Sequence, residues 1–218
     1  MTDSVCEKIF VFGASGHAKV VIDIIERQGL YRIACLVDDD PALKGNIVFG
    51  YDVAGGRNDL HELRTKSGIT RGIVAIGSNP ARTAVAGWLT ENDFALVTAV
   101  HPTAQLSRGV KVCSGSAVMA GVAINAGAVV GDNVIVNTGA TIDHDCIIGN
   151  GAHIAPGVTL CGTVQIGDGT FVCAGTTIIP NIVVGRNVIV GAGSTVVRNV
   201  PDGVQVLGTP AREVTRRL

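Results

Sequence analysis

Every sixth residue between Leu106 and Val196 is aliphatic, so an unbroken run of hydrophobic positions shares one fixed spacing. These positions are Leu106, Val112, Val118, Ile124, Val130, Val136, Ile142, Ile148, Ile154, Leu160, Ile166, Val172, Ile178, Val184, Val190 and Val196. Three residues after each of them, up to residue 193, stands glycine or asparagine, with Asp145 and Thr163 as the exceptions. Strands send alternate side chains to one face, so each aliphatic residue and the compact residue two positions before it share the inward side. Glycine and asparagine adopt positive φ at low cost, which predicts a corner at every sixth residue.

Three such corners close a triangular coil of eighteen residues, so the repeat predicts about five coils of a parallel β-solenoid. The composition agrees, because the chain has 29 glycines, 47% hydrophobic residues and only 4% aromatic residues. Glycine destabilises helices, whereas short β-branched strands joined by repeated turns use both residue types well. The composition therefore disfavours a helical bundle.

The first hundred residues have the alternating pattern of a small α/β domain. Apolar runs predict strands at 8–13, 31–37 and 73–77, and helical spacing predicts helices at 17–27 and 80–92. This alternation predicts a Rossmann-like βαβ domain with a parallel sheet. The dipeptide His101-Pro102 marks the join to the solenoid. The predicted organisation is a βαβ domain at 1–102, a solenoid domain at 103–200, and a C-terminal tail at 201–218 that caps the open end of the stack.

Charge and hydropathy limit the classes of partner. The formal net charge is −1 and no Lys/Arg cluster is interleaved with aromatic residues, which argues against nucleic acid as a partner. Polar residues and glycines interrupt every apolar run before the roughly 18 residues that span a bilayer, and the N-terminus lacks a signal-peptide pattern. We therefore expect a cytoplasmic protein without membrane insertion, whose six cysteines are free thiols.

A loop with the sequence Gly13-Ala-Ser-Gly16-His17-Ala-Lys19 follows the first predicted strand and opens the first predicted helix. Backbone N–H groups and the helix dipole favour an anion there, which predicts a phosphate site. Asp38 and Asp39 end the next strand, where a carboxylate accepts hydrogen bonds from a ribose or a base. A tight turn followed by a solvated acidic loop would explain the same residues. A redox dinucleotide is disfavoured, because the loop is not GxGxxG and the domain holds only about half of a dinucleotide fold.

A histidine, His144, lies at a predicted corner of the solenoid between two acids, Asp143 and Asp145. Asp145 occupies a position at which the repeat otherwise places glycine or asparagine, so we expect it to strain the backbone. An acid partner fixes the tautomer of an imidazole and keeps it basic enough to accept a proton near neutral pH. The pattern predicts a general base at His144, although an exposed corner histidine with solvated acids would have the same sequence.

Two further polar residues, Asn137 and His153, are predicted on one flat face in successive coils, whereas His144 is predicted at the opposite corner. A face of four strand residues is about 13 Å long, so His144 and His153 cannot meet at one small substrate within a single subunit. We therefore predict a cyclic oligomer in which the corner of one subunit meets the face of another. Taken singly, Asn137 and His153 are each compatible with an ordinary surface polar residue.

Several motifs together resemble one family over nearly the whole chain. They are Gly13-Ala-Ser-Gly16-His17-Ala-Lys19, Asp38-Asp39, the hexapeptide solenoid with Ile142-Asp143-His144-Asp145, Val200-Pro201, and Gly208-Thr209-Pro210-Ala211-Arg212. The chain resembles the bacterial sugar acetyltransferases of the PglD/NeuD type, which are hexapeptide-repeat acyltransferases. The resemblance implies a left-handed β-helix and a homotrimer with active sites between subunits. It also implies transfer from acetyl-CoA to the 4-amino group of a UDP- or GDP-linked amino sugar, in the biosynthesis of cell-surface polysaccharides or glycans.

The resemblance also assigns roles to matching residues. It makes His144 the catalytic base and Asp145 the acid that tunes it. The nucleotide of the sugar would contact Ser15, Gly16, His17, Asp38, Asp39 and Gly77, and acetyl-CoA would contact Asn137, His153, Gly162, Ala174 and Ala192. The predicted reaction is direct transfer, in which the amine is deprotonated by His144 and attacks the thioester carbonyl. His153 or a backbone N–H would stabilise the oxyanion while the CoA thiolate leaves.

Three other functions remain open. A sialic acid O-acetyltransferase would share the same motifs. A zinc enzyme of the carbonic anhydrase type would need about three histidine ligands, and the solenoid offers only His144 and His153, so no metal is expected. A non-catalytic trimeric scaffold that binds nucleotide sugars would explain the repeat and the small domain, but not the strained acid beside His144.

Overall fold

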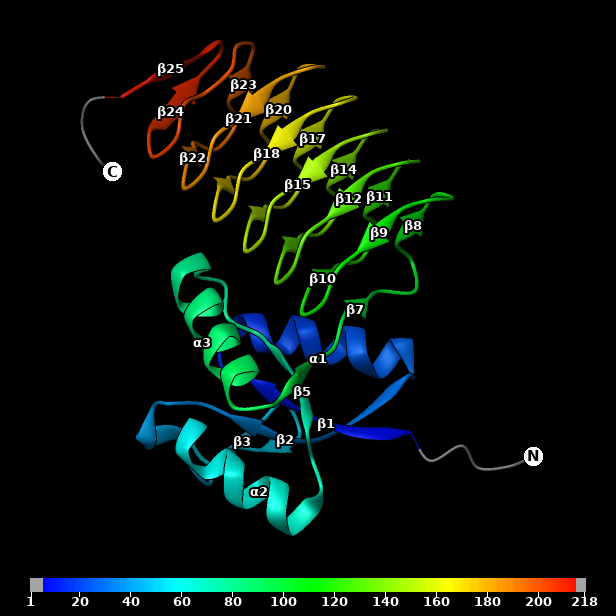
Figure 1. The fold of residues 1–218 in the computed structure, drawn as a ribbon, viewed down its shortest axis with the longest axis vertical. Helices are drawn as coiled ribbons and strands as arrows, with labels where there is room; N and C mark the ends of the chain where they lie inside the picture. The colour runs from blue at the N-terminus through cyan, green and yellow to red at the C-terminus, as the bar shows by residue number, and fades with distance from the viewer. Residues whose placement is uncertain (1–5, 215–218) are drawn as a thin grey trace. The chain divides into compact units, whose positions relative to one another are not determined.

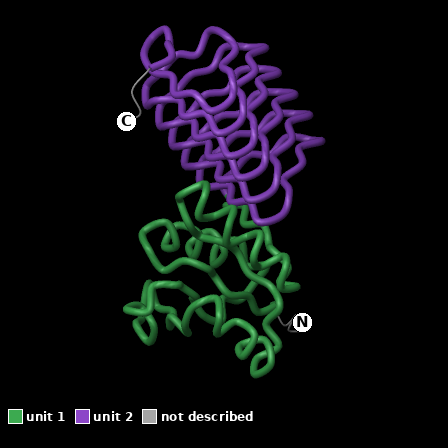
Figure 2. Tube along the Cα trace, turned by 60° about the vertical axis from the view of Figure 1, so that its left-hand side comes forward, with its two compact units in different colours: residues 1–102 green, residues 103–218 purple. Residues whose placement is uncertain are grey.

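The computed structural model describes residues 6–214, and the chain divides into two compact units, Met1–Pro102 and Thr103–Leu218 (Figure 2). Unit 1 is an α/β domain and unit 2 is a β-solenoid (Figure 1). The six cysteines are free thiols. No helix within residues 6–214 is long and apolar enough to cross a membrane.

Unit 1 is built on a parallel four-stranded sheet in the order β2-β1-β5-β6. Residues 9–12 of the inner strand β1 are buried, so both faces of the sheet must be covered by other elements. Phe10 and Phe12 point to one face and pack with Leu60 of α2 and Leu89 of α3, while α1 lies against β1 and β2. The main elements are β1 (Glu7–Phe12), α1 (Gly16–Gln28), β2 (Tyr31–Val37), α2 (Leu60–Ser67), β5 (Arg71–Val74), α3 (Asn79–Glu91), β6 (Ala95–Leu96) and β7 (Ala99–Val100).

The predicted strands and helices of unit 1 are confirmed, with ends that shift by a few residues. Helix α2, the strand β6, and a hairpin of β3 (Ile47–Val48) and β4 (Tyr51–Asp52) were not predicted from the sequence. Helix α2 buries only Leu60, so its hydrophobic periodicity is too weak to indicate a helix. Two short 3₁₀ helices, Pro41–Leu43 and Arg57–Asp59, flank the hairpin.

Unit 2 is a triangular solenoid with three faces of stacked, short parallel strands (Figure 1). The His153 face comprises β10 (Ala117–Val118), β13 (Ile135–Val136), β16 (His153–Ile154), β19 (Phe171–Val172), β22 (Ile189–Val190) and β24 (Gln205–Gly208). The Thr141 face comprises β8 (Gln105–Leu106), β11 (Ala123–Ile124), β14 (Thr141–Ile142), β17 (Thr159–Leu160), β20 (Thr177–Ile178) and β23 (Thr195–Val196). The Ile147 face comprises β9 (Lys111–Val112), β12 (Val129–Val130), β15 (Ile147–Ile148), β18 (Gln165–Ile166) and β21 (Val183–Val184).

The register confirms the predicted eighteen-residue coil. His153 pairs with Ile135 and with Phe171, so residues eighteen apart lie directly above one another on a face. All fifteen predicted corner residues from Gly109 to Gly193 have positive φ, and these include Asp145 (φ 57°) and Thr163 (φ 60°). The sequence exceptions therefore adopt the same left-handed conformation as the glycines that they replace.

The stack has about six turns, one more than the strict repeat predicts. The additional turn arises because the chain stays on the solenoid after residue 196 with shorter spacing, so that paired residues lie sixteen instead of eighteen positions apart. Val200 forms a bridge with Val184, and β24 pairs in parallel with β22. The segment β25 (Ala211–Glu213) then folds back antiparallel on β24, so the first part of the predicted tail extends the stack and the second closes it.

Candidate active site

The loop after β1 is held in place by backbone contacts that only glycine allows. Gly13 has φ 120°, and a Cβ atom there would lie 2.7 Å from the carbonyl oxygen of Ala75. The Gly13 N–H donates to the oxygen of Val37 at 2.7 Å, and the Ala14 N–H donates to Oδ2 of Asp38 at 2.8 Å. The loop and the end of β2 are therefore joined at the carboxyl edge of the sheet, where parallel α/β folds bind ligands.

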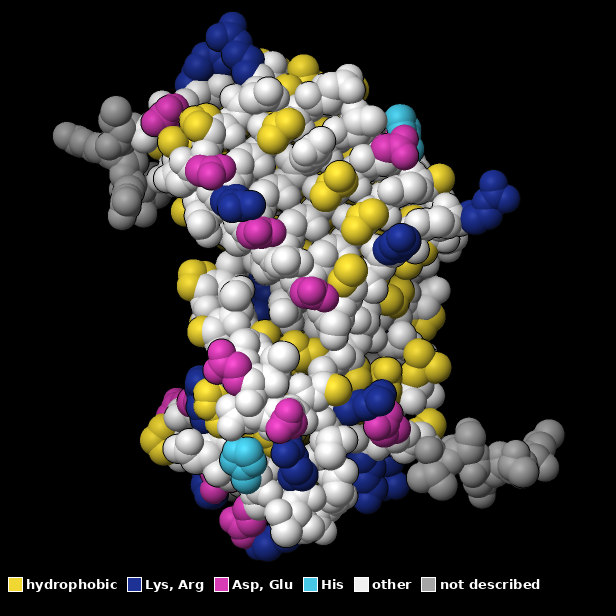
Figure 3. All heavy atoms as spheres, in the orientation of Figure 1, with side chains coloured by type: hydrophobic (Ala, Val, Ile, Leu, Met, Phe, Trp, Pro, Cys, Tyr) yellow, Lys and Arg dark blue, Asp and Glu magenta, His cyan; other side chains and the backbone are white. Residues whose placement is uncertain are grey.

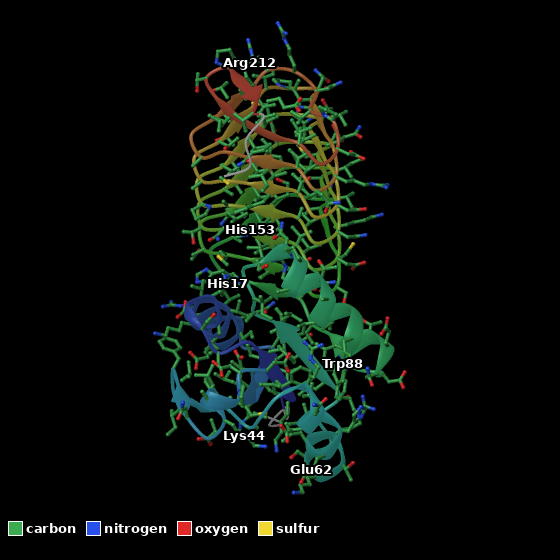
Figure 4. All side chains as sticks on the ribbon, turned by 90° about the vertical axis from the view of Figure 1, so that its left-hand side faces the viewer. His17, Lys44, Glu62, Trp88, His153 and Arg212 are labelled. Carbon is green, nitrogen blue, oxygen red and sulfur yellow. The ribbon has the colours of Figure 1, made fainter. Side chains whose placement is uncertain are left out.

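Helix α1 begins at this loop with its first-turn N–H groups uncovered by side chains. Ser15 is the N-cap but makes no side-chain capping bond, and the first turn holds no acid. His17 lies in this first turn (Figure 4), and its Nε2 is buried without a hydrogen-bond partner among the described residues. Burial, and then the charge of Arg82, lower the pKa of His17 to about 4, so the ring is neutral near neutral pH. The helix start therefore combines positive dipole, open N–H groups and an unsatisfied imidazole nitrogen.

The two acids at the end of β2 have different environments. Asp38 accepts from Ala14 N through Oδ2 and from Asp40 N through Oδ1, at 2.8 and 3.0 Å. Asp39 accepts from the backbone N and the guanidinium of Arg57, with Nε at 2.8 Å. Burial alone would raise the pKa of Asp39, but the hydrogen bonds and charge of Arg57 hold this pKa below its usual value. Arg57 as the partner of Asp39 was not predicted from the sequence.

Gly77 follows β5 at the same edge of the sheet, and a Cβ atom there would meet no atom within 4 Å. The loop around it is anchored from below by Arg82, whose side chain is buried. Arg82 donates to the carbonyl oxygens of Ile76 and Gly77 at 3.1 and 3.2 Å and to Oδ1 of Asn79 at 2.8 Å. Burial lowers the pKa of Arg82 to about 10. Four loops of unit 1, after β1, β2, β4 and β5, therefore converge on one edge.

In unit 2, His144 lies at the corner between the Thr141 face and the Ile147 face. Its Nδ1 is 2.9 Å from Oδ2 of Asp145, and its side chain is 57% exposed. The hydrogen bond to Asp145, and then the charge of Asp143, raise the pKa of His144 above its ordinary value. The carboxylate accepts a hydrogen bond from Nδ1–H, so in the neutral ring Nε2 carries the lone pair. The residue therefore has the tautomer, basicity and access of a general base.

The two acids that flank His144 have different hydrogen-bond partners. Only Asp145 contacts the ring, and its Oδ1 would lie 2.5 Å from a Cβ atom on Gly127, one coil earlier. Asp143 instead accepts from the backbone N–H of His144 and from Nδ2 of Asn125, each at 2.8 Å through Oδ1. Asn125 was not predicted as a site residue, although it precedes Asp143 by one coil.

Gly162 lies beneath the imidazole ring. A Cβ atom at this position would be 2.6 Å from Nε2 and 2.8 Å from Cε1 of His144. Gly162 follows His144 by eighteen residues and so occupies the same corner in the next coil. The structure thus places Gly162 with the base, away from the other residues expected to contact acetyl-CoA.

Those other residues gather on the opposite side of the coil. Asn137 Nδ2 is 3.2 Å from Nε2 of His153, and the His153 ring stacks on Phe171 with centroids 4.8 Å apart. Asn137 Oδ1 accepts from the N–H of Thr138, so the amide nitrogen must face His153 and its Nε2 must be the acceptor. His153 is only 8% exposed, which differs from an ordinary surface residue. Figure 4 shows it on the strand stack below Arg212.

Ala174 and Ala192 are exposed and follow β19 and β22, so they lie one coil apart at the edge of the His153 face. His144 therefore faces away from Asn137, His153, Ala174 and Ala192 within one chain, as the repeat predicts. Within residues 6–214, no group of three or more His, Cys, Asp or Glu side chains is arranged to hold a metal ion.

Comparison with known proteins identifies both units. The family model of the PglD N-terminal domain matches residues 8–89, and that of the bacterial transferase hexapeptide (six repeats) matches residues 127–162 and 163–198. The crystal structure of PerB from Caulobacter crescentus, in complex with CoA and GDP-perosamine, is 41% identical. It matches 97% of this chain and 98% of its own, with a TM-score of 0.90. The chain belongs to the PglD-type hexapeptide-repeat sugar acetyltransferases.

Two further relatives of this acetyltransferase family agree. The acetyltransferase domain of PglB from Neisseria gonorrhoeae, in complex with acetyl coenzyme A, is 35% identical over 95% of this chain and 99% of that chain, with a TM-score of 0.87. UDP-N-acetylbacillosamine N-acetyltransferase from Bacillus subtilis is 33% identical over 115 residues, so the match spans about half of that relative (52%). The solenoid is accordingly the left-handed β-helix of this family.

Proposed function

We propose that this protein is an acetyl-CoA-dependent N-acetyltransferase that acts on the 4-amino group of a UDP- or GDP-linked amino sugar. The observation that carries the proposal is the exposed His144, whose Nδ1 is fixed by Asp145 at 2.9 Å and whose Nε2 is left as a base. Similarity to PerB, whose structure holds CoA and GDP-perosamine, supports the choice of donor and acceptor. A cytoplasmic location and a role in glycan biosynthesis fit these two co-substrates.

In the proposed mechanism, the neutral sugar amine attacks the thioester carbonyl of acetyl-CoA. The C–N bond forms, and one amine proton passes to Nε2 of His144, which Asp145 stabilises as the imidazolium. His153 or a backbone N–H stabilises the oxyanion. The C–S bond then breaks, and the imidazolium returns the proton to the departing CoA thiolate.

In unit 1, the features at the start of α1 support binding of the nucleotide part of the substrate. The open N–H groups at Gly16 and His17 suit a diphosphate, and the unsatisfied Nε2 of His17 adds a polar contact. Asp38 retains acceptor capacity beyond its two backbone bonds, which suits a ribose or base donor. Ser15, Asp39 and Gly77 border the same edge of the sheet.

We also propose a homotrimer whose active sites lie between subunits. Asn137 and His153 lie on one face and His144 at the opposite corner, so a second copy must supply one of the two halves. The outward side chains of Ile147, Val183 and Ile189 are 42–50% exposed, and large apolar side chains in such positions suit subunit contacts. Figure 3 shows hydrophobic side chains exposed along the visible surface of the solenoid.

A sialic acid acceptor is the second candidate, and the charges near His144 disfavour it. A sialic acid carries a carboxylate, which Asp143 and Asp145 would repel.

A screen of acceptors tests the choice between a nucleotide-linked amino sugar and sialic acid. We expect thiol release from acetyl-CoA with a UDP- or GDP-linked 4-amino sugar and none with sialic acid. Release with sialic acid would favour O-acetylation, and release with no acceptor would favour a nucleotide-sugar-binding scaffold.

Replacing Gly162 with alanine separates two roles for this residue. If Gly162 supports the His144 ring, the added methyl displaces the base and lowers kcat by about 10²-fold, since a small misplacement of a catalytic group is costly. A contact with acetyl-CoA predicts instead a higher KM for acetyl-CoA. Steady-state kinetics measure both. Gly87→Ala in α3 is the matched control, because a Cβ atom there meets nothing within 4 Å. An unchanged kcat in Gly162→Ala would show that Gly162 does not position the His144 ring.

A further inference from the structure

The Thr141 face has a pocket of about 250 Å³ beside the His144 corner. Its polar lining consists of Asn125, Thr141, Asp143, Thr159 and Cys161. Cys161 directly precedes Gly162, on which the His144 ring rests, so the pocket borders the base. The hydroxyls of Thr141 and Thr159 lie 3.3 Å apart within this lining. The pocket therefore has a mixed lining, in which Ala123, Ile142 and Leu160 lie beside the polar groups, and it borders the corner that carries His144.

The two carboxylate oxygens of Asp143 differ in their hydrogen bonds. Oδ1 accepts from Asn125 Nδ2 and from His144 N, and these two bonds fix the orientation of the carboxylate. Oδ2 has no hydrogen-bond partner in the part of the chain that the structure describes. The hydrogen bond from Asn125, and then that from His144, lower the pKa of Asp143, so the group is ionised near neutral pH. A fixed anionic acceptor thus stands at the edge of the pocket.

We propose that this pocket receives the reacting end of the acceptor sugar and that Oδ2 of Asp143 accepts a hydrogen bond from its amino group. The inference rests on the proposed function and adds a residue that selects amines over alcohols. A neutral amine has two N–H donors, so it can bond to Asp143 Oδ2 and His144 Nε2 together and still point its lone pair at the thioester. A hydroxyl has one donor and leaves one of the two acceptors without a partner, which is costly. Asp143 takes no proton in the reaction; it orients the nitrogen while His144 accepts the proton.

The test uses GDP-perosamine and its analogue with a hydroxyl in place of the 4-amino group. We expect the wild-type protein to bind the amine more tightly in calorimetry without acetyl-CoA. In Asp143→Asn, we expect this preference to fall by about 10- to 100-fold, which is the effect of one hydrogen bond to a charged group. Kinetics with acetyl-CoA should show a matching rise in KM for the amino sugar, with the KM for acetyl-CoA unchanged.

Asp168→Asn is the matched control, because it removes the same charge from another corner of the solenoid and keeps an acceptor for the N–H of Asn150. A wild-type protein without preference for the amine, or an Asp143→Asn variant that keeps it, would overturn the inference. The binding measurement needs no turnover. If Asp143→Asn loses the amine preference but the wild-type protein transfers no acetyl group, the pocket is supported and the proposed reaction is contradicted. If the wild-type protein transfers the acetyl group but Asp143→Asn keeps the amine preference, the reaction is supported and the pocket is contradicted.

Discussion

Replacing His144 with alanine is expected to lower kcat by about 10²–10⁴, the range that general-base catalysis contributes. The ring is exposed and its loss opens only the surface above Gly162, so we expect the solenoid to stay folded. The nucleotide contacts are proposed on unit 1, so affinity for the nucleotide sugar should change little. Rapid-quench or steady-state assays give kcat, and calorimetry gives the binding constant. An unchanged kcat would remove His144 from the role of base.

The pH dependence of kcat distinguishes loss of a base from a general disturbance. A base must be deprotonated to act, so activity falls as the pH drops through the pKa of His144, which its acidic neighbours raise. Asp145→Asn keeps an acceptor for Nδ1–H but removes the charge, so the acidic limb should move to lower pH. In His144→Ala this limb should vanish. A limb that stays in place in both variants would belong to another group.

Much of the solenoid was predictable because its period is set by backbone geometry. Positive φ at each corner requires glycine, asparagine or a strained substitute, so Asp145 and its neighbour His144 were visible as exceptions. The same eighteen-residue period relates Asn125 to Asp143, Gly162 to His144 and Phe171 to His153, each pair one coil apart. The six-residue repeat indicates which positions face inward, but it does not show which outward side chains eighteen residues apart contact each other.

The contacts in unit 1 were less predictable because no period links them. Arg82 lies five residues beyond Gly77 in a helix, and only its burial reveals that it anchors the loop. Arg57 binds Asp39 across eighteen residues and an intervening hairpin. Sequence spacing shows which residues end neighbouring strands, but it does not show which arginine from elsewhere in the chain forms hydrogen bonds with those strand ends.

Mixing two inactive proteins, His144→Ala and His153→Ala, is expected to restore activity. A complete site needs the His144 corner of one subunit and the His153 face of the next, and each variant retains one of these. In randomly reassembled 1:1 trimers, a site is complete when a His153→Ala subunit supplies the corner and a His144→Ala subunit supplies the face, which holds for about a quarter of sites. Each variant alone has none.

The experiment requires proof of subunit exchange, which mass spectrometry of differently tagged subunits provides. After reversible dissociation, kcat per subunit of the mixture should approach about a quarter of the wild-type value, while either variant treated alone stays inactive. Mixing His144→Ala with Asp145→Asn is the matched control, because both changes damage the same corner. That mixture should stay at the average of its components. Exchange without recovery in the first mixture would show that corner and face do not share a site.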